Sequence, residues 1–171
     1  MPLLGSADRY EALSSCNDSV VYAVVSGFVE KKQKYWFPDY LYVLEIYWTS
    51  KTTTYAKRSY SDIITLQEQL LAYFSEKYDA GLLKSPVYVP RLQGKKMFRQ
   101  NSIDLAEQRE AEIQNFFREL LGGNPLVSSN KIVIDFLSRR HSDPTPSTSG
   151  GDNHVTSGED DDDGDDVLFD R

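Results

Sequence analysis

The sequence predicts an α+β fold, and three observations support this class. Three runs rich in β-branched and aromatic residues come first, and two long segments with helical periodicity follow them. Residues 141–171 of the 171-residue chain carry ten acidic side chains and one basic side chain, whereas residues 1–140 carry 16 acidic and 18 basic ones. We therefore expect a flexible N-terminal arm at 1–18, one folded domain at 19–140 and a disordered acidic tail at 141–171.

The first three elements are expected to be strands at 19–28, 40–48 and 52–59. Val20–Val25 is dense in residues that pack well on a pleated sheet. In the second run, alternate positions form one apolar face: Tyr42, Leu44, Ile46 and Trp48. The connections are too short for crossovers, so the pattern predicts an antiparallel meander.

A long helix is expected after Tyr60, because apolar residues recur there at steps of three and four: Ile63, Leu66, Leu70 and Phe74. Ser61 and Asp62 are both candidate N-cap residues for it. The segment 79–96 then holds two glycines and two prolines and is expected to be a long proline-containing loop. A loop of that length in a compact domain is usually functional.

A second long helix is expected at 102–121, with six candidate core positions: Ile103, Ala106, Ile113, Phe116, Phe117 and Leu120. Gly122 and Gly123 are expected to end it, because glycine accepts the left-handed conformation after a helix. Asn130 is a candidate cap for a last helix that runs to Leu137. The folded part is therefore predicted to be a three-stranded antiparallel meander packed on a helical subdomain.

Composition argues against several classes of protein. Cys16 is the single cysteine, which excludes a disulfide scaffold and a multi-cysteine zinc site. The two histidines, His141 and His154, follow the expected domain, so a histidine-based triad inside the fold is excluded. A net charge of +2 over residues 1–140 is small for a nucleic-acid-binding protein. We expect no enzyme, no metal, no cofactor and no nucleic-acid partner. No apolar run approaches the ~20 residues of a membrane span, so we expect a cytoplasmic protein.

Basic residues occur in three places that the expected fold could bring together. Lys57 and Arg58 end the third strand before Tyr60, and Arg109 lies on the second long helix. Three more follow the proline loop: Lys95, Lys96 and Arg99. Guanidinium and ammonium groups suit phosphates, while a tyrosine ring offers a flat face to a sugar or inositol ring. The pair Met97-Phe98 either inserts into a membrane surface or packs beneath the loop.

Three segments resemble the phox homology (PX) domain, in the order that this family has them. Lys57-Arg58-Ser59-Tyr60-Ser61-Asp62-Ile63 is similar to its Arg-Arg-Tyr-Ser-Asp-Phe signature, and residues 89–98 are similar to its proline-containing loop. The spacing of Arg109, Ile113 and Phe116 resembles its later helix pattern. The resemblance covers about residues 19–140.

The resemblance implies a phosphoinositide-binding, membrane-recruiting module. It implies that Tyr60 stacks on the inositol ring, that Lys95 meets the 1-phosphate and that Arg109 holds the far hydroxyls or phosphates. The family's 3-phosphate arginine directly precedes the aromatic residue, a position that Ser59 occupies here. Arg58 is one residue earlier, and in a strand this shift turns its side chain to the opposite face unless a bulge restores it. Lys57, Lys96 and Arg99 are auxiliary basic candidates.

Within the family, the chain resembles NADPH-oxidase organisers and SH3-and-PX adaptors, with sorting nexins as the second interpretation. A PX fold that has lost its lipid site and acts through protein contacts is a third. The first interpretation implies a monomer, bound peripherally to endosomal or plasma membranes that contain phosphoinositides. The acidic tail is a candidate contact for protein partners.

Overall fold

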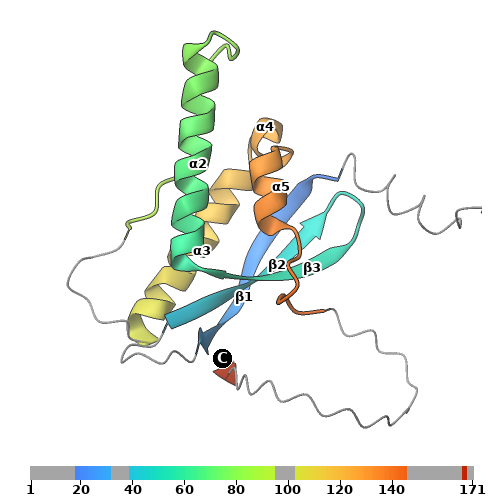
Figure 1. Ribbon diagram of the computed structural model, residues 1–171, viewed down its shortest axis with the longest axis vertical. Helices are drawn as coiled ribbons and strands as arrows, with labels where there is room; N and C mark the ends of the chain where they lie inside the picture. Colours follow the sequence, from blue (N-terminus) through green and yellow to red (C-terminus); the bar gives the residue numbers. More distant parts are fainter. Residues whose placement is uncertain (1–17, 32–38, 95–102, 146–166, 169–171) are drawn as a thin grey trace, which may run out of the picture.

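The computed structural model describes residues 18–31, 39–94, 103–145 and 167–168 (Figure 1). Of the arm predicted at 1–18, only Asp18 is among them. Five of the predicted site residues lie outside the described residues: Lys95, Lys96, Met97, Phe98 and Arg99.

The predicted meander is confirmed. Strands β1 (Val20–Lys31), β2 (Asp39–Trp48) and β3 (Thr53–Ser59) pair antiparallel in chain order. A two-residue strand, β4 (Val167–Leu168), adds to the free side of β1 and gives the order β3-β2-β1-β4. Leu168 pairs with Val29, so this part of the expected acidic tail returns to the sheet.

The turn between β2 and β3 closes without an Asn-Gly pair. Lys51 takes a positive φ of 64° and donates its N–H to the carbonyl of Trp48 at 2.9 Å. Asp18 supports the turn, because its carboxylate accepts hydrogen bonds from the hydroxyl of Thr49 and from the N–H and hydroxyl of Ser50. Asp18, which was expected to lie in a flexible arm, is therefore part of the folded domain.

One face of the sheet forms the core, as the alternation predicts. The four apolar side chains predicted on β2 are all buried: Tyr42, Leu44, Ile46 and Trp48. Ala56 and Arg58 of β3 pair with Leu44 and Tyr42 in an unbroken register, so both point to this same face. The bulge that would have turned Arg58 to the other face is absent from the described β2–β3 ladder.

Four helices follow the sheet in the described part of the chain: α2 (Tyr60–Asp79), α3 (Ile103–Leu121), α4 (Pro125–Ser128) and α5 (Lys131–Leu137). Helix α3 lies along the sheet, while α2 starts at the sheet and projects away from it beside α5 (Figure 1). The N-terminal parts of α2 and α3 lie at the same end of the molecule (Figure 1). Helix α4, which Asn124 caps and Pro125 starts, was not predicted.

Helical periodicity predicts the core positions well. All four predicted positions of α2 are buried, and so are five of the six predicted for α3. Ile103 is the exception, since 42% of its surface is exposed. It is the first residue of α3 and precedes Ala106, whose carbonyl oxygen accepts a hydrogen bond from the hydroxyl of Tyr42 at 3.2 Å.

The residues that start α2 and end α3 act differently from the prediction. Ser59, and neither Ser61 nor Asp62, is the N-cap of α2. Gly122 follows α3 as expected, but its φ is not positive. A Cβ atom at this position would lie 2.6 Å from the carbonyl oxygen of Arg118, so a close backbone approach requires glycine there.

A residue beyond the predicted boundary at 140 packs on the fold. Asp143 is 5% exposed, and its carboxylate accepts the N–H groups of Lys57 and Arg140. The segment that follows α5 is therefore part of the folded domain at least as far as Asp143.

Candidate functional site

A capping box fixes Tyr60 at the point where β3 becomes α2. The hydroxyl of Ser59 accepts the N–H of Asp62 at 3.1 Å, and the carboxylate of Asp62 accepts the N–H of Ser59 at 2.9 Å. Two of the backbone donors at the helix start are thereby satisfied. Tyr60 is the first helical residue, and its side chain is buried.

Arg109 of α3 lies over the ring of Tyr60. The guanidinium carbon is 4.3 Å from the ring centroid, which is a cation–π arrangement. Arg109 is half-buried and shares a helix face with Ala106 and Ile113, both of which are buried. The structure thus brings together two of the four residues predicted for the headgroup site.

A chain of hydrogen bonds links Tyr60 to the proline-containing segment and to α3. The N–H of Gly94 donates to the hydroxyl oxygen of Tyr60 at 3.1 Å, and this hydroxyl donates to Glu112 at 3.1 Å. The other carboxylate oxygen of Glu112 accepts the N–H of Gln93. Three segments that are distant in sequence therefore meet at the Tyr60 hydroxyl.

The surroundings of Tyr60 keep its hydroxyl protonated. Burial raises the pKa of Tyr60 to about 12, and the neighbouring Glu112 carboxylate adds to the rise. The Gly94 N–H and Arg109 act in the opposite direction, but their effect is smaller. At neutral pH the hydroxyl is therefore a stable donor to Glu112.

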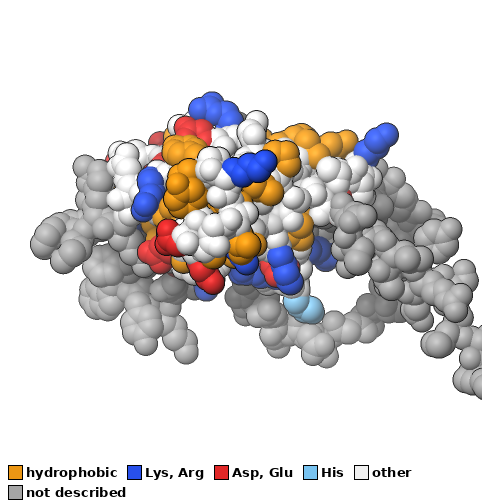
Figure 2. Space-filling view, turned by 90° about the horizontal axis from the view of Figure 1, so that it is seen from above, with side chains coloured by type: hydrophobic (Ala, Val, Ile, Leu, Met, Phe, Trp, Pro, Cys, Tyr) orange, Lys and Arg blue, Asp and Glu red, His pale blue; other side chains and the backbone are white. Residues whose placement is uncertain are grey.

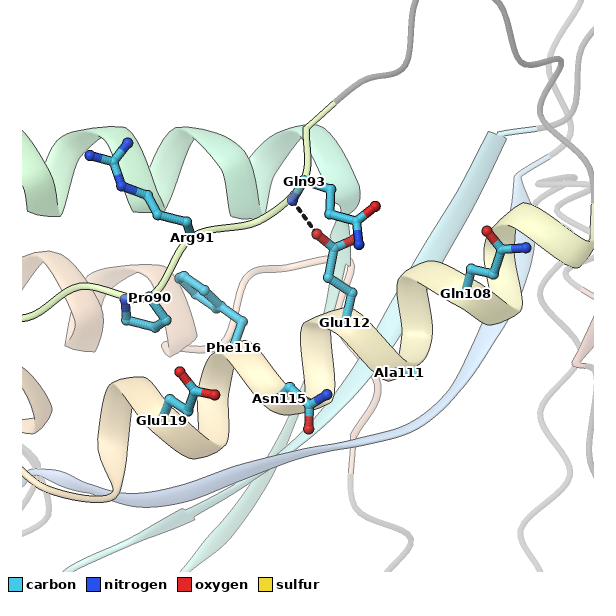
Figure 3. A pocket seen from close by; sticks show the side chains of 9 residues that line it. All are labelled: Pro90, Arg91, Gln93, Gln108, Ala111, Glu112, Asn115, Phe116 and Glu119. Atoms are coloured by element: carbon cyan, nitrogen blue, oxygen red, sulfur yellow. Dashed lines mark hydrogen bonds between the residues drawn. The ribbon is translucent and has the colours of Figure 1, made fainter.

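Two adjoining pockets lie between the segment 90–94 and α3. One, of about 300 Å³, is lined by Gln93, Gly94, Leu105, Gln108, Arg109, Ala111 and Glu112. The other, of about 340 Å³, extends toward Pro90 and Glu119. Figure 3 shows the second pocket, with the hydrogen bond from Gln93 to Glu112 at the boundary with the first. Arg91 lines the second pocket and extends away from α3 (Figure 3).

Arg58 does not join this site. Its side chain is 0% exposed, and one guanidinium nitrogen lies 2.9 Å from each carboxylate oxygen of Asp143. The same nitrogen also donates to the carbonyl oxygen of Lys57, and the other two guanidinium nitrogens donate to the carbonyl oxygens of Phe136 and Ser138. The Arg58 guanidinium thus faces α5 and the segment after it, on the side of β3 that the unbroken strand register dictates.

Lys57 does not line the 300 Å³ pocket either. Sequence reasoning missed two residues: Glu112, which holds Tyr60 and Gln93, and Asp143, which holds Arg58. The position of Glu112 three residues after Arg109 places the two side chains on neighbouring parts of α3. No comparable local signal exists for Asp143, which is separated from Arg58 by 85 positions.

The surface in Figure 2 shows no concentration of positive charge. On this face, Lys and Arg side chains are dispersed among acidic and hydrophobic ones. No helix in the described residues is long and apolar enough to cross a membrane. Within the same residues, no cluster of three His, Cys, Asp or Glu side chains is arranged to hold a metal ion.

The family model described as the PX domain matches residues 46–140, a span that holds Tyr60, Arg109 and the pocket that Arg109 lines. The chain belongs to the PX domain family. PX domains in general are phosphoinositide-binding modules that recruit proteins to membranes.

Two kinds of curated protein are similar in sequence to part of this chain. It is 32% identical over 110 residues to human "SH3 and PX domain-containing protein 2B" and 33% identical over 110 residues to mouse "SH3 and PX domain-containing protein 2A". Each match covers 63% of this chain but only 12% and 10%, respectively, of the relative. The chain therefore spans about a tenth of the length of these relatives.

Proposed function

We propose that the pocket of about 300 Å³ lined by Arg109, next to the buried Tyr60, binds the headgroup of a phosphoinositide and thereby anchors the chain to a membrane. The position of the Arg109 guanidinium, 4.3 Å from the Tyr60 ring centroid beside a pocket of about 300 Å³, is the observation that supports it best. A guanidinium can donate a pair of hydrogen bonds to a phosphate or to vicinal hydroxyls, and the pocket gives them space next to it.

Lys95 is the second cation of the proposed site. It directly follows Gly94 in the sequence, and the N–H of Gly94 is bonded to the Tyr60 hydroxyl. In this proposal its ammonium group meets the 1-phosphate. The role given to Arg58 in the sequence analysis is withdrawn, because its guanidinium is buried and bound to Asp143.

The residues that follow Lys95 supply the contact with the bilayer in this proposal. Met97 and Phe98 insert between lipids, each buried CH₂ contributing about 0.8 kcal/mol. Lys96 and Arg99 lie on either side of this pair and add about 1 kcal/mol each near an anionic leaflet. Lys57, on β3, adds to the general positive charge. Headgroup binding and insertion would then have to occur together for stable attachment.

We further infer an adaptor protein rather than an enzyme, since the names of the relatives combine the PX domain with SH3 domains. In this role the chain is a cytoplasmic monomer that attaches peripherally to plasma or endosomal membranes, in the manner of an oxidase organiser. A sorting-nexin-like role in endosomal transport is the alternative, and the compartment of the intact protein in cells separates the two. The acidic tail is proposed to contact protein partners.

Co-sedimentation with liposomes that carry each phosphoinositide in turn tests the headgroup site. We expect the wild type to prefer one or a few headgroups and Arg109→Ala to bind them about tenfold or more weakly, since a hydrogen bond to a charged group contributes roughly 1.5–3 kcal/mol. Arg118→Ala is the matched control, because Arg118 is exposed in the last turn of the same helix. Equal binding of all headgroups, or undiminished binding by Arg109→Ala, would contradict the proposal.

A further inference from the structure

Glu112 places a negative charge inside the pocket that is proposed to bind a phosphorylated ligand. It lies one helical turn after Arg109, lines the 300 Å³ pocket and accepts hydrogen bonds from the Tyr60 hydroxyl and the Gln93 N–H. In a pocket for phosphates a carboxylate is electrostatically unfavourable, so its presence there calls for a function.

The carboxylate retains capacity for a ligand. A carboxylate has about four lone-pair sites, and the hydrogen bonds from Tyr60 and Gln93 occupy two of them. The Glu112 carboxylate accepts hydrogen bonds from hydroxyl groups. It repels ionised phosphate oxygens, because they are negatively charged and have no hydrogen to donate. It therefore discriminates between these two substituents of an inositol ring.

The part of the chain that the structure describes contributes little positive charge to the pocket around Glu112. Among the described residues that line the 300 Å³ pocket, Arg109 is the one cation and Glu112 the one anion. The guanidinium of Arg58, which would have added a second cation, is bound to Asp143. This balance suits a ligand of low charge better than one with several phosphate groups.

We propose that Glu112 makes the pocket select phosphoinositides with a single monoester phosphate over those with two or three. Hydroxyls of the inositol ring donate hydrogen bonds to Glu112, while Arg109 holds the single monoester phosphate. The pocket is small for a ligand site, so a ring inside it brings its substituents close to the carboxylate. A second or third phosphate on the ring then meets the charge of Glu112. This inference rests on the headgroup site proposed above.

The test compares ratios of affinity, because a general weakening would not identify selectivity. Vesicles of phosphatidylcholine carry a fixed fraction of one phosphoinositide, and binding of the full chain is measured for each monophosphate, bisphosphate and trisphosphate. We expect the wild type to bind its best monophosphate about tenfold more tightly than any bisphosphate. In Glu112→Gln this ratio should fall to near unity, mainly because the bisphosphates bind more tightly.

Three variants separate selectivity from other roles of Glu112. Glu119→Gln makes the same change of charge two turns later on α3, outside the 300 Å³ pocket, and should keep the wild-type ratio. Tyr60→Phe removes the hydroxyl bonded to Glu112 but keeps the carboxylate, so affinity should fall while the preference for monophosphates remains. Glu112→Ala removes the charge without adding an amide donor and should reproduce the effect of Glu112→Gln. Circular dichroism establishes that each variant is folded.

The outcomes distinguish this inference from the function on which it rests. A wild type that binds no phosphoinositide would end both. A wild type that binds headgroups but prefers bisphosphates would overturn the role of Glu112 alone. The same holds if folded Glu112→Gln keeps the wild-type ratio, since Glu112 would then only hold Tyr60 and Gln93 in place.

Discussion

One guanidinium nitrogen of Arg58 lies 2.9 Å from each carboxylate oxygen of Asp143, and neither side chain is more than 1% exposed. Arg58 comes from the end of β3, and Asp143 from the segment after α5. The pair therefore joins the sheet to residues whose composition is typical of a disordered acidic tail. Its chemistry leads to three predictions about stability.

Removal of the carboxylate should be strongly destabilising. Asp143→Asn leaves the buried Arg58 without a counter-charge, and breaking such a pair costs about 3–5 kcal/mol. Urea unfolding measures the loss. Asp135→Asn is the control, because Asp135 forms an exposed ion pair with Lys131 within α5 and should leave the stability nearly unchanged. Equal stability of the two variants would mean that the Arg58–Asp143 pair contributes nothing.

Acid should weaken the fold through the same carboxylate. Burial raises the pKa of Asp143, but hydrogen bonds from the N–H groups of Arg140 and Lys57 and the contact with Arg58 outweigh it and lower the pKa below its ordinary value. Burial lowers the pKa of Arg58 in turn, yet a guanidinium stays charged at any pH of interest, so Asp143 is the group that titrates. The stability that Asp143 contributes is then present above about pH 4, the value for an unfolded chain, and is lost as the pH falls through the lower folded value. Unfolding measured from neutral pH to pH 3 should show a smaller acid-induced loss in Asp143→Asn than in the wild type.

The position of Asp143 also predicts where the chain can be shortened. A chain that ends after residue 140 lacks Asp143 and should unfold at a much lower denaturant concentration than the full chain. A chain that ends after residue 145 retains the carboxylate and its bonds to Lys57 and Arg140, so it should have nearly full stability. Denaturation of both fragments by urea provides the comparison. Similar stability of the two fragments would contradict the assignment of residues 141–145 to the folded domain.

Loss of the N-cap should destabilise α2. Ser59→Ala removes the acceptor for the N–H of Asp62 and should cost about 1 kcal/mol, the usual effect of losing a serine cap. Ser61→Ala, two residues later in the first turn, tests the cap position that the sequence suggested and should have little effect. Thermal unfolding of both variants decides between them. A larger loss in Ser61→Ala would contradict the capping box at Ser59.

Alkaline pH should destabilise the domain through its buried tyrosines. Burial raises the pKa of Tyr60 to about 12 and also raises that of Tyr42. Because an unfolded tyrosine ionises near pH 10, the folded state holds these protons more tightly, and its stability is full below about pH 10 and falls as the pH rises toward 12. Urea unfolding between pH 8 and pH 11 measures the slope, which should be shallower in Tyr60→Phe. An identical slope in the wild type and the variant would show that Tyr60 does not take part.

Local patterns were sufficient to predict most of the fold. The alternation in β2 and the three- and four-residue steps in α2 each report on one element, and burial of Leu44 and Leu70 follows from them directly. The N-cap of α2 was missed because Ser59, Ser61 and Asp62 are all good caps. The choice depends on where β3 stops pairing, and Ser59 is the last residue opposite β2.

The candidate site was only partly predictable. The proximity of Tyr60 and Arg109 followed from the resemblance to the PX family, since no periodicity links residues of two different helices. The burial of Arg58 depends on an unbroken strand register and on a partner 85 positions away, and neither can be read from the residues around it. Glu112 was overlooked because its partners, Tyr60 and Gln93, come from other segments.

Ser59 occupies the position that holds the 3-phosphate arginine in the signature that this chain resembles, and here it starts a helix instead. A mutation that places arginine at this position would add a phosphate ligand and remove the capping box in the same step. Replacement of Ser59 by arginine therefore lowers the stability of the domain, unless another part of the domain has first become more stable. To engineer 3-phosphate recognition into this chain, stabilising substitutions should therefore be introduced first and the arginine at position 59 last.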